Sequence, residues 1–152
     1  MAFQFRLQKL LDYREDEKNT AAEELGRRQR ELLEIKKELE RLQQDEQRMM
    51  ELSRGQQEQE QKLNLFALRA VESYRVFLQE RFRCKQQELF RSEDQVEQQR
   101  REVVENWKRC QVLEKLKEKD LSGYNREELK REQLLNDEIS LYSYIKRPKG
   151  GD

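Results

Sequence analysis

Residues 7–49 read LQKLLDYREDEKNTAAEELGRRQRELLEIKKELERLQQDEQRM, and the spacing of their apolar residues decides the fold. If Leu11 occupies core position a of a seven-residue repeat, core position d falls on Leu7. Nine of the thirteen a and d positions are apolar, although only 34% of the chain is apolar. This enrichment is typical of a coiled coil rather than of a globular helix. The thirteen positions are Leu7, Leu11, Arg14, Lys18, Ala21, Leu25, Arg28, Leu32, Ile35, Leu39, Leu42, Glu46 and Met49.

A second heptad stripe follows further along the chain. Six of its seven members are apolar, and they recur at strict seven-residue spacing: Leu68, Arg75, Phe82, Leu89, Val96, Val103 and Cys110. The companion core positions turn polar between Lys85 and Asn106, so we expect water to reach the middle of this seam.

Glycine marks the expected boundaries. Ser53-Arg54-Gly55 interrupts the repeat and predicts a turn at 53–56 between a helix over about 4–52 and one over about 57–120. Gly123 predicts the end of the second helix, followed by a short helix over about 125–146. The chain is therefore predicted to be all-α: a single domain, 1–152, forming a long two-helix antiparallel coiled-coil hairpin with a short C-terminal helix. A parallel dimer of unbent helices is the alternative, and the interrupted repeat favours a monomer.

A turn centred near residue 54 sets the expected pairing. It places Ile35 opposite Tyr74 and Leu32 opposite Phe77. It also brings the N-terminus and the end of the second helix together at one tip, where the aromatic residues Phe3 and Phe5 lie across from Trp107.

Composition excludes several classes of function. Lys+Arg and Asp+Glu both number 32 and are interspersed, whereas a nucleic-acid-binding protein would show a basic excess or stripe. No apolar run is long enough to span a bilayer, and the N-terminus lacks the apolar core of a secretory signal, so we expect a cytoplasmic protein. Cys84 and Cys110 would lie about 39 Å apart on one helix, too far for a disulfide.

Catalytic chemistry is also absent from the sequence. There is no His, and the five glycines are scattered rather than gathered in a phosphate-binding loop. Two isolated cysteines do not make a zinc site. We therefore expect no enzyme, no cofactor and no metal.

Two surfaces remain as candidates for partner binding. Leu63, Ala70, Phe77 and Cys84 form another stripe at seven-residue spacing, with Ala67 and Tyr74 beside it. The stripe is either the local seam, shifted by a stutter in the repeat, or an exposed strip that binds a partner.

The tip is the second candidate. There Phe3, Phe5, Leu7 and Trp107 either clasp the chain ends together or contact a partner, beside the basic residues Arg6, Lys9 and Arg14.

Three segments resemble the flagellar export protein FliJ family. They are FQFRLQKLLDYREDEK at residues 3–18, SYRVFLQ at 73–79 and REELKREQLLNDEIS at 126–140. The resemblance implies a cytoplasmic antiparallel coiled coil, similar to a rotary ATPase stalk, that assembles the export ATPase ring. The implied partners are the export ATPase with its regulator, the cytoplasmic domain of the export gate and export chaperones, so the protein would reach the membrane only through partners.

The resemblance also assigns surfaces. It implies that the ATPase binds the tip, at Phe3–Arg14 and the end of the second helix, and that the gate binds Tyr74 and Phe77. A stalk protein of virulence type III secretion and a plain structural coiled-coil spacer are the alternatives.

Overall fold

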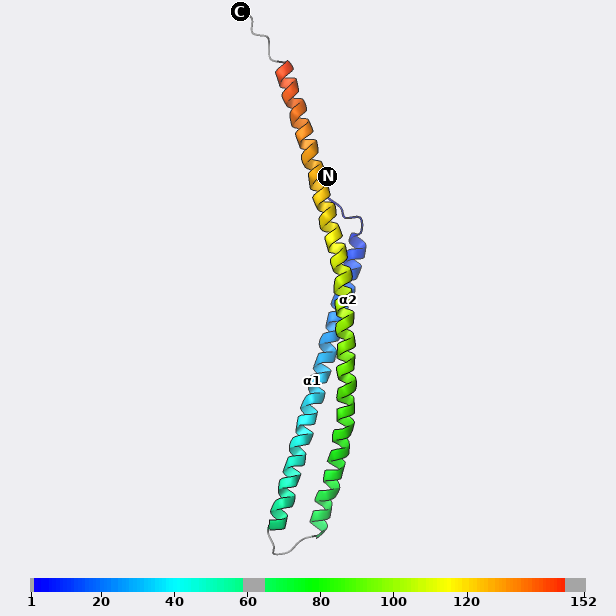
Figure 1. Cartoon of the computed structure of the whole chain (residues 1–152), viewed down its shortest axis with the longest axis vertical. Coiled ribbons are helices and arrows are strands. Elements are labelled where there is room, and N and C mark those ends of the chain that lie inside the picture. Colours follow the sequence, from blue (N-terminus) through cyan, green and yellow to red (C-terminus); the bar gives the residue numbers. More distant parts are fainter. Residues whose placement is uncertain (1, 59–64, 147–152) are drawn as a thin grey trace, which may run out of the picture. The chain divides into compact units, whose positions relative to one another are not determined.

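The computed structural model describes residues 2–58 and 65–146, which form two long helices (Figure 1). Helix α1 spans Gln8–Glu58 and helix α2 spans Leu65–Ile145. The described residues contain no strand, so the predicted all-α class is confirmed. Within those residues, neither helix has an apolar stretch that could cross a lipid bilayer.

The chain divides into two compact units, and α1 packs on α2 in each. The terminal unit takes Met1–Lys18 together with Asn106–Asp152, and the central unit takes Asn19–Glu105.

Cross-helix contacts give the direction of the two helices. In the central unit Lys36 Nζ lies 3.6 Å from a Glu93 carboxylate oxygen, and Gln79 donates to Glu46 at 3.3 Å. Residue numbers rise along one helix as they fall along the other, so the helices are antiparallel. This confirms the predicted two-helix hairpin.

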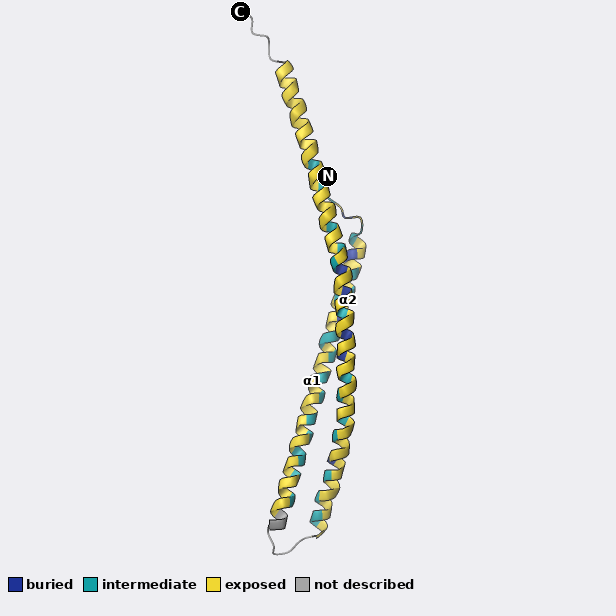
Figure 2. Ribbon diagram, viewed as in Figure 1, coloured by how far each residue is buried: buried dark blue, intermediate teal, exposed yellow. Residues whose placement is uncertain are grey.

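The predicted seam of α1 is the observed one. All thirteen a and d positions between residues 7 and 49 are buried or half-buried, while most of the remaining surface is exposed (Figure 2). The same holds for the heptad stripe of α2 between residues 68 and 110. A seven-residue repeat turns the same stripe of each helix toward its neighbour, which is why spacing alone identified these residues.

One polar residue of the seam, Gln99, forms a hydrogen bond across it. Gln99 is buried, and its side-chain amide donates to the backbone carbonyl of Ala21 at 3.2 Å. At this point of the seam the buried amide group therefore has a protein acceptor.

Lys85 is held in the seam by two carboxylates. Its ammonium lies 2.7 Å from both Glu38 on α1 and Glu88 on α2. Hydrogen bonds from Lys85 to Glu38 and Glu88 raise the pKa of Lys85, and the bond to Lys85 lowers the pKa of Glu38.

The predicted boundaries at glycine are wrong. Ser53-Arg54-Gly55 lies inside α1, and the predicted turn at 53–56 is helical. Gly123 lies inside α2, so the separate helix over 125–146 is the continuation of α2. A helical glycine costs only about 1 kcal/mol, which the rest of a long helix can offset. Helix α1 ends at Glu58 and α2 begins at Leu65, and residues 59–64 between them lie outside the described residues.

The predicted pairing is wrong for the same reason. Because α1 continues past Gly55, each of its residues meets a later residue of α2 than expected. The contact between Gln79 and Glu46 matches the region of Tyr74 and Phe77 with the last turns of α1, not with Leu32 and Ile35.

Neighbouring residues on α2 test this assignment of the seam. Leu78 is 3% exposed in the seam, whereas Phe77 is 52% exposed beside it. We expect Leu78→Ala to lower the free energy of unfolding by about 2–3 kcal/mol, because it leaves a cavity between the helices. Phe77→Ala should change it by less than about 1 kcal/mol.

Urea unfolding followed by circular dichroism measures both values. Equal losses in the two variants would mean that Phe77 also belongs to the seam.

Candidate partner-binding surfaces

An exposed strip of α2 is the first candidate. It comprises six exposed residues spaced alternately by four and three, and we call these the outer strip: Phe66, Ala70, Ser73, Phe77, Glu80 and Cys84. The seam residues of the same segment, among them Val71 and Leu78, are half-buried or buried. The seam has therefore not shifted, and the stutter that was one explanation of this stripe is wrong. Leu63 lies outside the described residues.

Aromatic and basic groups pack together at the centre of the outer strip. The rings of Tyr74 and Phe77 are stacked, with centroids 6.1 Å apart. The guanidinium carbon of Arg81 lies 5.8 Å from the centroid of the Phe77 ring, a cation–π contact. Both rings remain half exposed, so their faces are available to another molecule. The sequence analysis identified Ala70, Tyr74, Phe77 and Cys84. It missed Phe66, although its spacing of four residues from Ala70 could have placed it on the same side of the helix.

The terminal unit contains a small apolar cluster. Phe5, Leu11 and Cys110 are buried in it, and Phe3, Leu7 and Leu113 pack against them. The ring of Phe3 lies 5.7 Å from that of Tyr124. Aromatic residues thus hold the N-terminal segment against α2, but the predicted partner was wrong. Trp107 lies outside the cluster and is 51% exposed, because the true pairing brings later residues of α2 to Phe3.

Basic residues surround a groove beside this cluster. The groove has a volume of about 430 Å³ and is lined by Phe3, Gln4, Phe5, Arg6, Gln8, Lys9 and Lys117. Arg6 and Lys9 are exposed, as the tip prediction requires, and Lys117 joins them from α2.

Arg14 differs from the other predicted basic residues. It is half-buried, and its guanidinium lies 2.7 Å from Glu17. The hydrogen bonds from Arg14 and Tyr13 to Glu17 lower the pKa of that carboxyl group. Arg14 is therefore paired within α1, whereas Arg6 and Lys9 are exposed.

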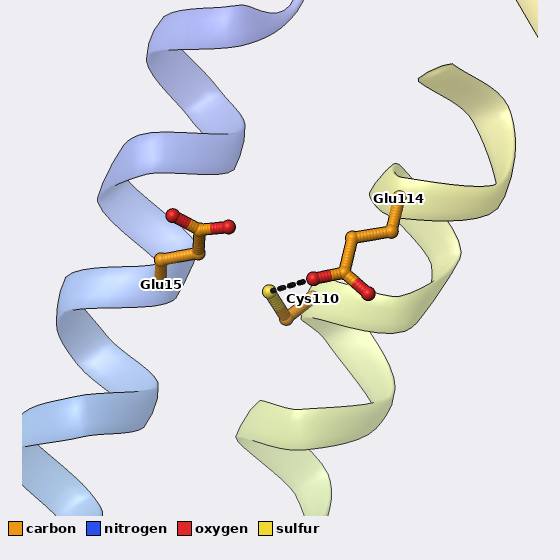
Figure 3. A group of neighbouring side chains, drawn as sticks. All are labelled: Glu15, Cys110 and Glu114. Atoms are coloured by element: carbon orange, nitrogen blue, oxygen red, sulfur yellow. Dashed lines mark hydrogen bonds between the residues drawn. The ribbon is translucent and has the colours of Figure 1, made fainter. Parts of the chain in front are cut away.

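Cys110 meets two carboxylates in the terminal unit (Figure 3). Glu15 comes from α1 and Glu114 from α2, and the ligand atoms of the three residues lie within 4.8 Å of one another. The thiol of Cys110 is 1% exposed and donates to Glu114 at 3.7 Å. Burial raises the pKa of Cys110, whereas a metal ligand must be a thiolate. The arrangement is thus better suited to a packed, hydrogen-bonded thiol than to a metal ligand set.

The two cysteines should differ in reactivity. Cys84 is exposed, whereas Cys110 is buried and its raised pKa keeps the thiol protonated further into the alkaline range. We expect iodoacetamide at pH 8 to alkylate Cys84 at least about tenfold faster than Cys110 in the folded chain. Mass spectrometry of the intact protein and of its Cys84→Ser and Cys110→Ser variants measures the two rates.

Guanidinium chloride should abolish the difference, since both thiols are then accessible. Equal rates without denaturant would show that the cluster around Cys110 opens readily.

Comparison with known proteins supports one family. The family model described as Flagellar FliJ protein matches residues 3–149 of the 152. No curated protein and no solved structure matches the chain. Since the family match covers nearly the whole chain, the chain belongs to the FliJ family of flagellar proteins, whose members are non-catalytic components of the type III protein export apparatus.

Proposed function

We propose that this protein is a cytoplasmic, monomeric stalk that joins the export ATPase to the export gate. The terminal unit binds the ATPase and promotes assembly of its ring. The region around Tyr74 and Phe77 binds the cytoplasmic domain of the gate. Export chaperones and the regulator of the ATPase are further partners, and the protein reaches the inner membrane only through such contacts.

One observation carries the gate contact. Tyr74 and Phe77 are stacked on each other and half exposed, on a face of α2 that the hairpin does not use. Exposed aromatic groups of this kind are typical of binding hot spots, because a partner gains apolar burial at little conformational cost.

The terminal unit supports the ATPase contact in a different way. Its apolar cluster clasps the N-terminal segment onto α2, while Arg6, Lys9 and Lys117 gather at the groove beside the cluster. A stalk that meets several subunits of a ring in turn is best served by a firm core with polar contacts spread outside it.

Aromatic substitution tests the gate contact. The double variant Tyr74→Ala with Phe77→Ala should bind the purified cytoplasmic domain of the gate at least about tenfold more weakly, because hot-spot aromatics each contribute more than about 1 kcal/mol. Its helicity and melting should remain close to those of the original chain. Phe90→Ala is the control, since Phe90 is exposed on α2 outside the outer strip.

Isothermal titration calorimetry provides the affinities. If the double variant and Phe90→Ala bind the domain equally well, the gate contact lies elsewhere.

Charge reversal tests the ATPase contact. Arg6→Glu with Lys9→Glu should weaken binding to the purified ATPase, and the difference from the original chain should be larger at low salt, where charges are less screened. The fold should survive, since exposed charges contribute little to stability. Arg30→Glu with Lys37→Glu makes the same change in net charge on the exposed surface of the central unit.

Titrations at two salt concentrations distinguish the outcomes. Unchanged affinity at both would remove Arg6 and Lys9 from the contact and favour a structural spacer.

A further inference from the structure

The segment of α2 around Phe77 has two faces with heptad spacing. One is the seam with α1. The other is the outer strip, whose six residues recur at the a and d positions of a second heptad from Phe66 to Cys84. A helix that shows two such stripes has the surface pattern needed to pack against two neighbouring helices. Among the described residues, α1 covers the seam and leaves the outer strip exposed.

The surface of the outer strip also has a shape that suits the binding of a helix. A groove of about 350 Å³ lies along it, lined by Phe77, Glu80, Arg81, Cys84, Lys85 and Glu88. All six residues belong to α2, so this is a depression on the surface of one helix. In coiled coils, a side chain of one helix inserts into a depression of this kind, formed by residues of the facing helix.

Charges at the edges of the strip indicate which helix would fit. The positions that flank it, e and g of the second heptad, are Ala67, Arg69, Tyr74, Val76, Arg81 and Arg83. All the charged residues among them are arginines. Arg81 lies close enough to Glu38 of α1 to help lower the pKa of that carboxyl group, and it lines a pocket with Glu38. Within residues 2–58 and 65–146, no ion pair involves Arg69 or Arg83. A partner helix with acidic side chains at its own edges would supply the opposite charges.

We propose that the outer strip binds a single amphipathic α-helix of a partner protein, apolar along its contact stripe and acidic at its edges. The distance from Phe66 to Cys84 is eighteen residues, or about 27 Å, so the partner helix needs about five turns. This inference rests on the proposed function in assigning partner binding to Tyr74 and Phe77, and it specifies the chemistry of that partner.

A second copy of the chain does not satisfy these features. In an antiparallel pair of outer strips, like edge positions face each other. Arg69 of one copy would then lie near Arg83 of the other, and like charges opposite each other are unfavourable. The arginines therefore favour a different, acidic helix over self-association.

Two designed peptides test the proposal. Both are 21 residues long with Leu at a and d, and they carry either Glu or Lys at every e and g position. Like charges at these positions also keep each peptide from pairing with itself. We expect the full chain to bind the Glu peptide at least about tenfold more tightly than the Lys peptide, measured by fluorescence anisotropy.

Charge reversal should invert this preference. The triple variant Arg69→Glu, Arg81→Glu, Arg83→Glu should prefer the Lys peptide, and Phe77→Ala should weaken binding of the Glu peptide. The control variant Arg27→Glu, Arg30→Glu, Lys37→Glu has the same net charge as the triple variant, but its changes lie on α1. It should keep the preference of the original chain for the Glu peptide.

Several outcomes would overturn the proposal. They are equal binding of both peptides to the original chain, inversion of the preference by the control variant, or self-association of the chain that Phe77→Ala abolishes.

Titration with the gate domain separates this inference from the proposed function. If the domain binds the original chain and the triple variant alike, and the peptides bind without selectivity, the inference fails and the gate contact stands. If the peptides bind selectively and the domain does not bind, the gate contact fails and the helix-binding strip stands.

Discussion

The seam between α1 and α2 is the interaction on which the structure depends, and it is narrow. In a pair of helices each helix has only one neighbour, so only one stripe of each can be buried. Leu78 and Phe77 illustrate this limit, since adjacent residues of one helix point in directions about 100° apart. Leu78 is buried in the seam, and Phe77 has no interior to enter within the hairpin. Apolar side chains outside the stripe are thus left on the surface by geometry.

The same geometry explains which parts of the fold could be predicted. The heptad repeat identified the buried stripe of both helices, because its apolar residues recur on the side of a helix that packs against a neighbour. Register is different: sliding one helix along the other by a whole heptad leaves the same kinds of residue facing each other. Only the position of the turn or a specific polar contact distinguishes such registers. The pair of Gln99 with the Ala21 carbonyl is a contact of this kind, and it is not visible in a pattern of apolar residues.

Glycine was a poor guide to the turn between the helices. The free energy that one glycine costs a helix is small compared with the free energy lost when a whole helical turn unfolds. Ser53-Arg54-Gly55 interrupts the apolar pattern but remains helical within α1. The misplaced turn affected the predictions for some candidate sites and not for others. The sequence grouped Phe77 and Tyr74 in one stripe, either exposed or part of a shifted seam, and their exposure in the structure decides for the exposed strip. Trp107 was misplaced, and Tyr124 and Lys117 were missed, since their roles depend on which residues near the N-terminus they meet.

The overall charge composition is a second property that predicts little about local surfaces. A net charge of zero with interspersed signs excludes a basic protein, but it does not exclude local surfaces of one sign. Residues seven or fourteen apart lie on the same side of a helix, as Arg69 and Arg83 do, and residues three or four apart are close enough to form ion pairs. Arg75 is paired with Glu72 in this way, which removes both from the balance of charge at the strip. Ion pairs between fully exposed side chains contribute little to stability. The distribution of the remaining charges is therefore little constrained by folding and is left to the recognition of partners.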